Sequence, residues 1–391
     1  MGCPYVSGMA RVKPRMSRTL LFVVNVDWFF LSHRLPIALE AIRRGYKVHI
    51  ATSLTGKRSD LERYGLVVHS LALDRSSEAV GSALRTMAQL WKIFKAVRPD
   101  VVHLITIKPV LLGGLVARLS GVPAIVVAVS GLGFVFVARG IKASARRCLV
   151  NLLYRLVLGH KNLKVIFQNP DDLTNIKMIA ALSNSKIIMI HGSGVDLRQY
   201  RVMPIPLGIP IILMAARLLA DKGVFEFVYA SKLLRSRGCK ARFVLVGPVD
   251  IENPTGFTQA EVSAWVNDGL VEWWGHRSDM PQVLAAAQVV VLPSYYGEGL
   301  PKVLIEAAAC GRVVITTDHP GCRDAIDPNV TGVLVPIRNI EALANAMEAL
   351  INNPLRCQQM GLAGRALAKK AFDVRQVVAT HLQIYQELIG K

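Results

Sequence analysis

Short apolar runs alternate with amphipathic stretches along almost the whole chain, and this alternation limits the possible folds more than any other feature. Strands separated by helices and short connections form a parallel sheet that is covered on both faces. A helix is expected over 34–45, and a longer helical pattern runs from the second strand to about residue 97. The expected strands of this first doubly wound sheet are 19–26, 47–52, 100–105, 124–129, 164–169 and 186–191.

The pattern begins again after a Pro-rich stretch, 203–210, which we interpret as a linker. Two such units suit a chain of 391 residues, and ligands of these sheets bind outside the carboxyl ends of the strands, so a cleft between the units is expected. The expected strands of the second unit are 211–216, 241–247, 289–294, 313–317 and 332–336. The predicted division is an extension over 1–18, an N-terminal domain over 19–202, a C-terminal domain over 203–372 and a helix over 373–391 that packs back toward the N-terminal domain.

The formal net charge is +20, and it is concentrated in the first half of the chain. Residues 1–200 contain 28 Lys and Arg against 10 Asp and Glu, whereas residues 201–391 contain 19 against 17. No acidic residue occurs between Asp100 and Asp171, where nine basic residues stand. One-sided positive charge attracts polyanions. Because no motif that reads DNA or RNA accompanies it, we expect an anionic membrane surface as partner and no nucleic acid.

Two segments in this basic region bear on membrane contact. Residues 119–138 are uncharged and long enough to span a bilayer, but Pro123 and several glycines favour a buried strand followed by a Gly-rich loop. Residues 141–160 indicate either a helix that docks on a membrane surface or a core helix with a basic outer face. The apolar positions at helical spacing are Ile141, Ala145, Cys148, Leu149, Leu152, Leu153 and Leu156.

The chain carries no sign of export. No apolar segment precedes Leu20, so the start does not resemble a secretory signal, and the six cysteines form no CxxC pair. Cys310, His319 and Cys322 are close in the sequence but lack a fourth ligand, so we expect no metal. We predict a cytoplasmic protein that is peripheral on the inner face of the cytoplasmic membrane.

Two carboxylates, Glu298 and Glu306, stand eight residues apart after an expected strand. One lies in the loop and the other inside the next helix, so both can face the carboxyl ends of the strands. The amino terminus of that helix offers unpaired N–H groups and a positive dipole, which suits a diphosphate. The alternative is a solvated loop charge and a helix-surface residue.

Arg217 and Lys222 follow the first strand of the second unit, and Gly223 leads into a helix. Two cations at the end of one strand can hold a diphosphate, one through a planar fork and the other as a point charge. A solvated turn is the alternative.

These motifs together resemble the donor half of the family-4 retaining glycosyltransferases, most of all bacterial members that extend undecaprenyl-diphosphate-linked sugars. The most specific part is the EGLP motif at 298–301, which is followed by Glu306 and by the ACG motif at 309–311. The resemblance covers about residues 19–390. The matching segments are 217–223, 245–247, 274–280, 292–311, 317–326 and 332–336, and more loosely 27–52, 100–109, 130–134, 167–172 and 192–196.

The resemblance implies a GT-B fold, two Rossmann-like domains facing across a cleft. It also implies that Arg217 and Lys222 hold the diphosphate and assist its departure, that Glu298 contacts the donor sugar, and that Glu306 contacts the ribose. No metal ion or other cofactor is implied, and stabilising charge on the departing diphosphate is electrostatic catalysis. The donor-binding residues implied are Arg217, Lys222, Gly247, Glu298, Gly299, Leu300, Pro301 and Glu306, with Arg217, Lys222 and Glu298 catalytic.

The acceptor side departs from the family pattern at two points. Ser130 stands where a His is often found, and Asn25 and Asp27 occupy the place of a Gly-Gly pair after the first strand. For three candidates the alternatives are a polar residue at a helix start (His33), a core histidine (His103) and a solvated loop charge (Lys108). The candidate acceptor contacts, all near carboxyl ends of expected strands, are Asn25, Asp27, His33, His103, Lys108, Ser130 and Gly131.

From the resemblance we expect transfer of a hexose or N-acetylhexosamine, with retention, from a UDP-sugar to an undecaprenyl-diphosphate-linked sugar in surface polysaccharide, O-antigen or glycoprotein glycan assembly. The alternatives are a sugar-nucleotide epimerase of the same architecture and a catalytically silent scaffold of a polysaccharide-assembly complex.

Overall fold

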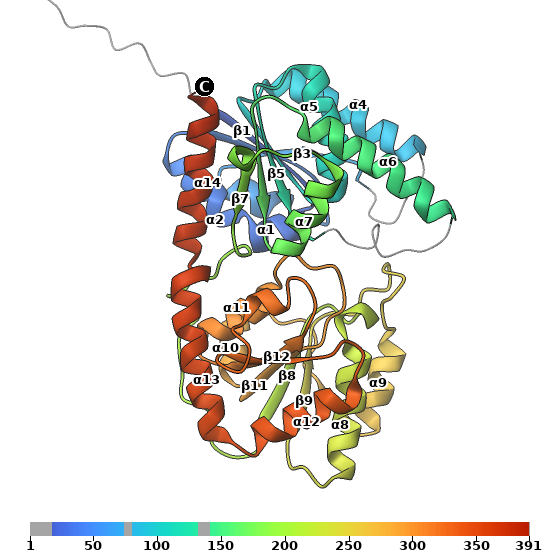
Figure 1. Cartoon of the computed structure of the whole chain (residues 1–391), viewed down its shortest axis with the longest axis vertical. Helices are drawn as coiled ribbons and strands as arrows, with labels where there is room; N and C mark the ends of the chain where they lie inside the picture. The colour runs from blue at the N-terminus through green and yellow to red at the C-terminus, as the bar shows by residue number, and fades with distance from the viewer. Residues whose placement is uncertain (1–17, 74–79, 132–140, 391) are drawn as a thin grey trace, which may run out of the picture.

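The computed structural model describes residues 18–73, 80–131 and 141–390, with side chains of 141–145 left aside. The predicted extension therefore lies almost wholly outside the described residues, as does most of the Gly-rich loop expected after residue 129. Two lobes stand one above the other, each with its own sheet (Figure 1). We call them the N-lobe and the C-lobe.

The N-lobe contains a parallel sheet in which the described strands follow the order β3-β2-β1-β4-β5-β6-β7. This order places β1 at the centre and winds the chain outward in both directions, as the alternating pattern predicts. The strands are β1 (Thr19–Val26), β2 (Lys47–Ser53), β3 (Val67–Ser70), β4 (Val101–Ile105), β5 (Ala124–Val129), β6 (Leu163–Phe167) and β7 (Ile187–Met189).

Helices cover both faces of this sheet, because the central strands are apolar on both sides. In β1, Leu21 and Val23 enter one core cluster, while Leu20, Phe22 and Val24 enter the other. The first cluster is covered by α4 to α7 and the second by α1 to α3 and α14. The helices and helical turns of the N-lobe are α1 (Asp27–His33), α2 (Leu35–Arg43), α3 (Arg58–Arg63), α4 (Val80–Val97), η1 (Pro109–Gly113), α5 (Gly114–Ser120), α6 (Ile141–Leu158), α7 (Pro170–Ile179) and η3 (Asn184–Lys186).

The long helical pattern expected between the second strand and residue 97 is wrong in part. The structure divides it into α3, the strand β3 and α4. The strand β3 lies at the edge of the sheet and has two exposed and two half-buried residues, so it lacks the apolar run that marked the other strands. Within the uncharged stretch 119–138, which is long enough to span a bilayer, residues 124–129 form the buried strand β5, as predicted. In the part of the chain that the structure describes, no helix combines the length and the apolarity needed to cross a bilayer.

The C-lobe repeats the architecture with a parallel sheet of order β10-β9-β8-β11-β12-β13, counted over described residues. Its short edge strand β10 was not expected from the sequence. The strands are β8 (Ile211–Ala215), β9 (Arg242–Val246), β10 (Glu272–Trp273), β11 (Val289–Leu292), β12 (Val313–Thr317) and β13 (Gly332–Val335). The helices and turns are η4 (Ala220–Lys222), α8 (Val224–Ser236), α9 (Gln259–Asn267), α10 (Met280–Ala285), α11 (Lys302–Ala309), η5 (Arg323–Ala325), α12 (Ile340–Ile351), α13 (Pro354–Leu367) and η6 (Ala368–Phe372).

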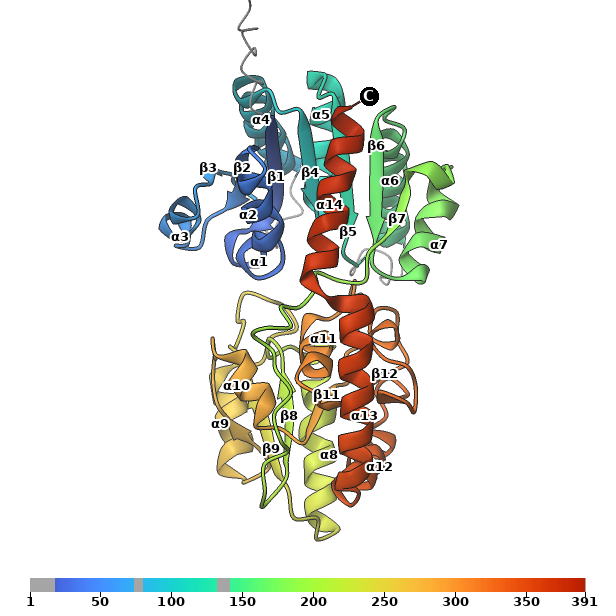
Figure 2. The same ribbon diagram turned by 90° about the vertical axis from the view of Figure 1, so that its left-hand side faces the viewer.

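The chain crosses between the lobes twice, and the two crossings pair with each other. After β7 the backbone N–H of Val195 donates to Phe372 O at 2.8 Å, and Val374 N–H donates back to Val195 O at 3.1 Å. The last helix, α14 (Val374–Ile389), then packs on the N-lobe sheet. Figure 2 shows α13 and α14 running along one side of both lobes.

Candidate functional site

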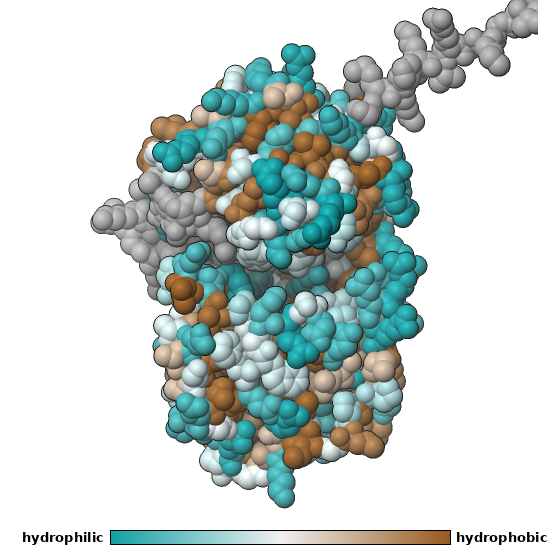
Figure 3. Space-filling model, turned by 180° about the vertical axis from the view of Figure 1, so that it is seen from behind, coloured by the Kyte–Doolittle hydropathy of each residue, from teal (hydrophilic) through white to brown (hydrophobic). Residues whose placement is uncertain are grey.

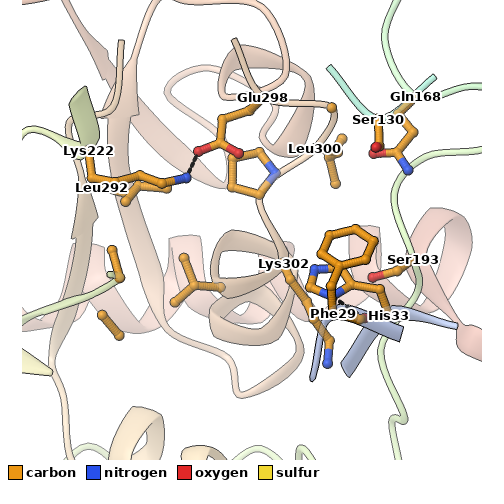
Figure 4. A pocket seen from close by; sticks show the side chains of 15 residues that line it. Phe29, His33, Ser130, Gln168, Ser193, Lys222, Leu292, Glu298, Leu300 and Lys302 are labelled. Carbon is orange, nitrogen blue, oxygen red and sulfur yellow. Dashed lines mark hydrogen bonds and ion pairs between the residues drawn. The ribbon is translucent and has the colours of Figure 1, made fainter. Parts of the chain in front are cut away.

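A cavity of about 210 Å³ lies between the lobes, outside the carboxyl ends of strands from both sheets. Seen from behind, a constriction marks the boundary between the lobes, with hydrophilic side chains on both sides of it (Figure 3). The side chains that project into the cavity are drawn in Figure 4. The lining residues are Phe29, His33, Ser130, Gln168, Ser193, Ala215, Ala216, Lys222, Leu292, Glu298, Gly299, Leu300, Pro301, Lys302 and Val303.

The loop from β11 to α11 forms the C-lobe wall of the cavity. It carries Glu298 and ends at Pro301, which precedes the first residue of α11, Lys302. The first turn of a helix leaves backbone N–H groups without partners inside the helix. The cavity therefore has hydrogen-bond donors and a positive helix end on this side, which suits an anionic ligand.

Lys222 and Glu298 point toward each other in the cavity and form an ion pair (Figure 4). Lys222 ends the short turn η4, and Gly223 follows with φ of +81° where a side chain would collide with Pro293. Burial and the nearby Arg217 guanidinium lower the pKa of the Lys222 ammonium to about 7. A carboxylate or a diphosphate beside it favours the charged form.

Arg217 lies next to this pair but does not line the cavity. Its Nη1 donates to Asp250 Oδ2 at 2.8 Å, so the guanidinium is held by a carboxylate of the loop after β9. Gly247, at the start of that loop, has φ of +139°, and a side chain there would collide with the Ala216 carbonyl. Gly247 thus lets the two strand ends approach each other.

Glu306 is buried in α11, only 5% exposed, and does not line the cavity. The Tyr200 hydroxyl donates to Glu306 Oε1 at 2.6 Å, and Lys302 Nζ lies 3.2 Å from the same oxygen. Burial and the neighbouring carboxylate raise the pKa of the Tyr200 phenol. Both contacts involve Oε1.

On the N-lobe side, His33 and Phe29 reach the cavity from α1, while Ser130, Gln168 and Ser193 follow the ends of β5, β6 and β7. The His33 ring stacks on Phe29 with centroids 4.2 Å apart, and its Nδ1 lies 3.2 Å from Phe29 O. Burial, with Lys302 and Arg34 nearby, lowers the pKa of His33 to about 3. His33 is therefore neutral at pH 7.

Two of the candidate acceptor residues lie elsewhere, with partners inside the N-lobe. Asp27 is fully buried, and its carboxylate accepts hydrogen bonds from Trp28 N, Thr55 N, Thr55 Oγ1 and Lys57 N at 2.6–3.2 Å. His103 is fully buried under α14, where its Nδ1 lies 2.7 Å from the Tyr385 hydroxyl. We leave both out of the proposed acceptor site.

Three further candidate acceptor residues, Lys108, Asn25 and Gly131, lie outside the lining of the cavity. Lys108 precedes the turn η1 and does not line the cavity. Asn25 is half-buried near the end of β1, and its Oδ1 finds no partner among the described residues. Gly131, with φ of +95°, packs directly against the backbone of Gly297 and Glu298 in the other lobe.

The sequence left out several residues that the structure brings to the site. Phe29, Gln168, Ser193 and Lys302 line the cavity, and Tyr200 touches Glu306. The four lining residues follow a strand end or lie one helical turn from a selected residue, which is the signal that could have found them. No such signal marks Tyr200, which is 106 positions from Glu306. Cys310, His319 and Cys322 are the cysteines and histidine that stand close together in the sequence. Over the described ranges, no group of three or more His, Cys, Asp or Glu could hold a metal ion.

Two family models match the chain. Residues 19–169 match the model described as glycosyl transferase 4-like, and residues 209–353 match glycosyl transferases group 1. The chain is a glycosyltransferase of these families. Its fold is GT-B, as predicted.

Relatives match along most of this glycosyltransferase. The Campylobacter jejuni N,N'-diacetylbacillosaminyl-diphospho-undecaprenol alpha-1,3-N-acetylgalactosaminyltransferase is 29% identical over 92% of this chain and 98% of its own length. The Escherichia coli UDP-Gal:alpha-D-GlcNAc-diphosphoundecaprenol alpha-1,3-galactosyltransferase is 26% identical over 68% of this chain and 69% of its own.

Among solved structures, Anabaena HepE in complex with UDP and glucose superposes with a TM-score of 0.75 at 17% identity, covering 93% of this chain and 98% of that one. The lipopolysaccharide glycosyltransferase WaaG gives a TM-score of 0.73 at 15% identity, over 95% of this chain and 100% of WaaG. These likenesses concern the fold. The comparisons favour neither the epimerase nor the scaffold alternative.

Proposed function

We propose that this glycosyltransferase moves a hexose or N-acetylhexosamine from a UDP-sugar to an undecaprenyl-diphosphate-linked sugar, with retention at the anomeric carbon. The observation that carries the proposal is the pair of Lys222 and Glu298, which face one cavity beside the amino terminus of α11. The names of the two relatives, which act on undecaprenyl-diphosphate-linked sugars, support the choice of acceptor.

The donor is held by C-lobe residues in this proposal. Lys222 leaves Glu298 for the diphosphate, which is the stronger anion, and Arg217 adds a second cation from beside it. Glu298 is then free to accept hydrogen bonds from hydroxyls of the donor sugar. Because Tyr200 and Lys302 both contact Oε1 of Glu306, we assign its Oε2 to the ribose hydroxyls.

The reaction follows from this placement. The bond from the anomeric carbon to the diphosphate oxygen breaks, and Lys222 and Arg217 stabilise the negative charge that develops on UDP. The acceptor hydroxyl attacks from the face that UDP leaves, and its proton passes to the departing diphosphate. His33 is neutral and adjoins the N-lobe wall of the cavity, so it can orient that hydroxyl by a hydrogen bond.

A membrane surface next to the N-lobe would supply the lipid-linked acceptor, and we propose that α4, α5 and α6 form the docking face. These helices adjoin one another (Figure 1) and expose large apolar side chains beside basic ones. The inner face of α6, with Val150, Tyr154 and Val157, is buried in the core, so the exposed leucines are additional to the core face. The exposed apolar residues are Val80, Leu84, Trp91, Leu119, Leu149, Leu152 and Leu156, and exposed bases include Arg85, Lys92, Lys95, Arg118 and Arg155.

A transfer assay tests the proposal. The protein is incubated with UDP-galactose, UDP-glucose, UDP-GlcNAc or UDP-GalNAc and a polyprenyl-diphosphate-linked GlcNAc, and product is read by mass and by anomeric NMR coupling. We expect one donor to add one sugar in α configuration, and Glu298→Gln to slow the addition by about 10²–10³-fold. A β-linked product would contradict retention.

Sedimentation with lipid vesicles tests the proposed docking face. If the proposal holds, the protein sediments with phosphatidylglycerol vesicles in preference to phosphatidylcholine vesicles at low salt.

A further inference from the structure

The backbone carbonyls of Glu298 and Gly299 are contacted from the opposite lobe by one side chain, Asn169. The Nδ2 of Asn169 donates to Gly299 O at 2.9 Å and lies 3.3 Å from Glu298 O. Asn169 follows β6 in the N-lobe, about 130 positions earlier in the chain. Its side chain is fully buried. The loop that carries the proposed sugar-binding carboxylate is therefore attached to the acceptor-side lobe.

The Asn169 amide can take only one orientation in this network. Its Oδ1 accepts from Asp172 N at 2.8 Å as the N-cap of α7, which leaves Nδ2 to face the other lobe. Nδ2 also donates to Asp172 Oδ2 at 3.0 Å. With its two hydrogens the amide thus reaches Asp172 in its own helix and the carbonyls of Glu298 and Gly299. We call the loop between β11 and α11, which carries these two carbonyls and the carboxylate proposed to bind the donor sugar, the donor loop.

The contact between the lobes at this point leaves no space for intervening side chains. A Cβ on Gly131 would collide with Gly297 O, and a Cβ on Gly299 would collide with the Gln168 side chain. On another wall of the cavity, Lys302 Nζ donates to Ser32 O of α1 at 2.9 Å. The donor loop is therefore fixed to the N-lobe at two points, by Asn169 at Glu298 and Gly299 and by Lys302 at the start of α11.

We infer that Asn169 is a positioning residue, which orients Glu298 toward the donor sugar only when the two lobes are in contact. This inference rests on the proposed function of Glu298. The other proposed donor contacts, Arg217, Lys222 and Glu306, belong to the C-lobe and hold the nucleotide without Asn169. Recognition of the sugar, but not of the nucleotide, therefore depends on the N-lobe, and binding of UDP precedes correct placement of the sugar.

The test compares two substitutions with a matched control. Asn169→Ser keeps an N-cap oxygen for α7 but loses the reach to the donor loop, and Asn169→Asp keeps the shape but places a carboxylate against the two carbonyls. The control is Asn353→Ser, which changes another Asn N-cap, that of α13, whose Oδ1 accepts from Arg356 N at 3.0 Å. Melting temperatures identify any variant that fails to fold.

Three readouts decide the inference. We expect both Asn169 variants to lower kcat by about tenfold or more and to remove the affinity difference between UDP-sugar and UDP. The affinity for UDP itself stays within about twofold, and amide exchange of residues 295–300 becomes faster than in the Asn353→Ser protein. Equal losses of UDP and UDP-sugar affinity, or an unchanged kcat and loop exchange, would overturn the inference. A wild-type protein that bound no UDP would instead overturn the proposed donor site, and the exchange readout would still decide whether Asn169 holds the loop.

Discussion

The two walls of the cavity differ in how their residues are spread along the sequence. On the C-lobe side, Lys222 follows Arg217 by five positions and Glu306 follows Glu298 by eight. Lys222 and Glu298 line the cavity, and Arg217 and Glu306 do not. On the N-lobe wall, the residues come from α1 and from the ends of β5, β6 and β7. The C-lobe residues form two local pairs, one after β8 and one after β11, and each pair can be recognised from its spacing in the sequence. The N-lobe residues come singly from several strand ends, so they can be brought together only once the topology is known.

The largest expected effect is on the C-lobe wall. Glu298→Gln removes the carboxylate from the donor sugar, and we expect kcat to fall by about 10²–10³-fold while UDP affinity changes little. Steady-state kinetics and calorimetry with UDP measure the two effects. Glu341→Gln, an exposed carboxylate in α12, serves as control. If UDP affinity fell as far as kcat, Glu298 would belong to the nucleotide pocket and not to the sugar pocket.

Two substitutions in the N-lobe compare Asp27, which is buried and hydrogen-bonded inside the lobe, with His33, which lines the cavity. Asp27→Ala leaves several backbone donors without their partner, so we expect a loss of about 2–3 kcal/mol of unfolding free energy with normal turnover by the folded protein. His33→Ala should do the opposite, lowering kcat with little change in stability. Denaturant titration and kinetics on the same samples measure both. Loss of turnover by a stable Asp27→Ala protein would return Asp27 to the acceptor site.

The pH dependence of donor binding sharpens the role of Lys222. Burial lowers the pKa of Lys222 to about 7, so in the protein without ligand the ammonium loses its proton above that pH. Binding of a diphosphate favours the charged ammonium, so above pH 7 it must be accompanied by uptake of a proton. We expect UDP-sugar affinity to fall by about tenfold between pH 7 and pH 8.5. In Lys222→Arg the dependence should vanish, because the guanidinium stays charged. A wild-type affinity that is flat across this range would contradict the assignment.

The smallest effect concerns the outer face of α6. Leu149 and Leu152 are 56% and 52% exposed, so their replacement by Ser should leave stability unchanged and weaken binding to phosphatidylglycerol vesicles by about tenfold. Leu362→Ser changes a leucine of equal exposure, 52%, in α13 of the other lobe and is the control. If both proteins sedimented equally with vesicles, α6 would not be the docking helix.

The sequence predicted both sheets and the cluster of donor residues because these depend on local pattern. Apolar runs predicted the central strands. The edge strands β3 and β10 were not predicted, because short edge strands bury few side chains and so carry no apolar run. The hydrogen bonds from Tyr200 to Glu306 and from Asn169 to Gly299 join residues more than a hundred positions apart. Asp27 looks like an acceptor residue in the sequence because it directly follows an expected strand, and His103 because it lies near the carboxyl end of one. Only the packing of α14 and of the loop after β2 shows them to be enclosed.

Arg217, Lys222, Glu298 and Glu306 together form one site for a nucleotide-sugar in this proposal, with Glu298 on the sugar and the other three on the nucleotide. The most direct test is a thermal-shift panel of UDP, GDP, ADP and several UDP-sugars on the wild-type protein and on Glu306→Ala. A ligand at about 100 times its Kd adds about 2.7 kcal/mol to the free energy of unfolding. We predict such a stabilisation by UDP compounds in the wild type and its loss in Glu306→Ala. A folded wild-type protein that no nucleotide stabilises, or a shift that persists in Glu306→Ala, would contradict the claim.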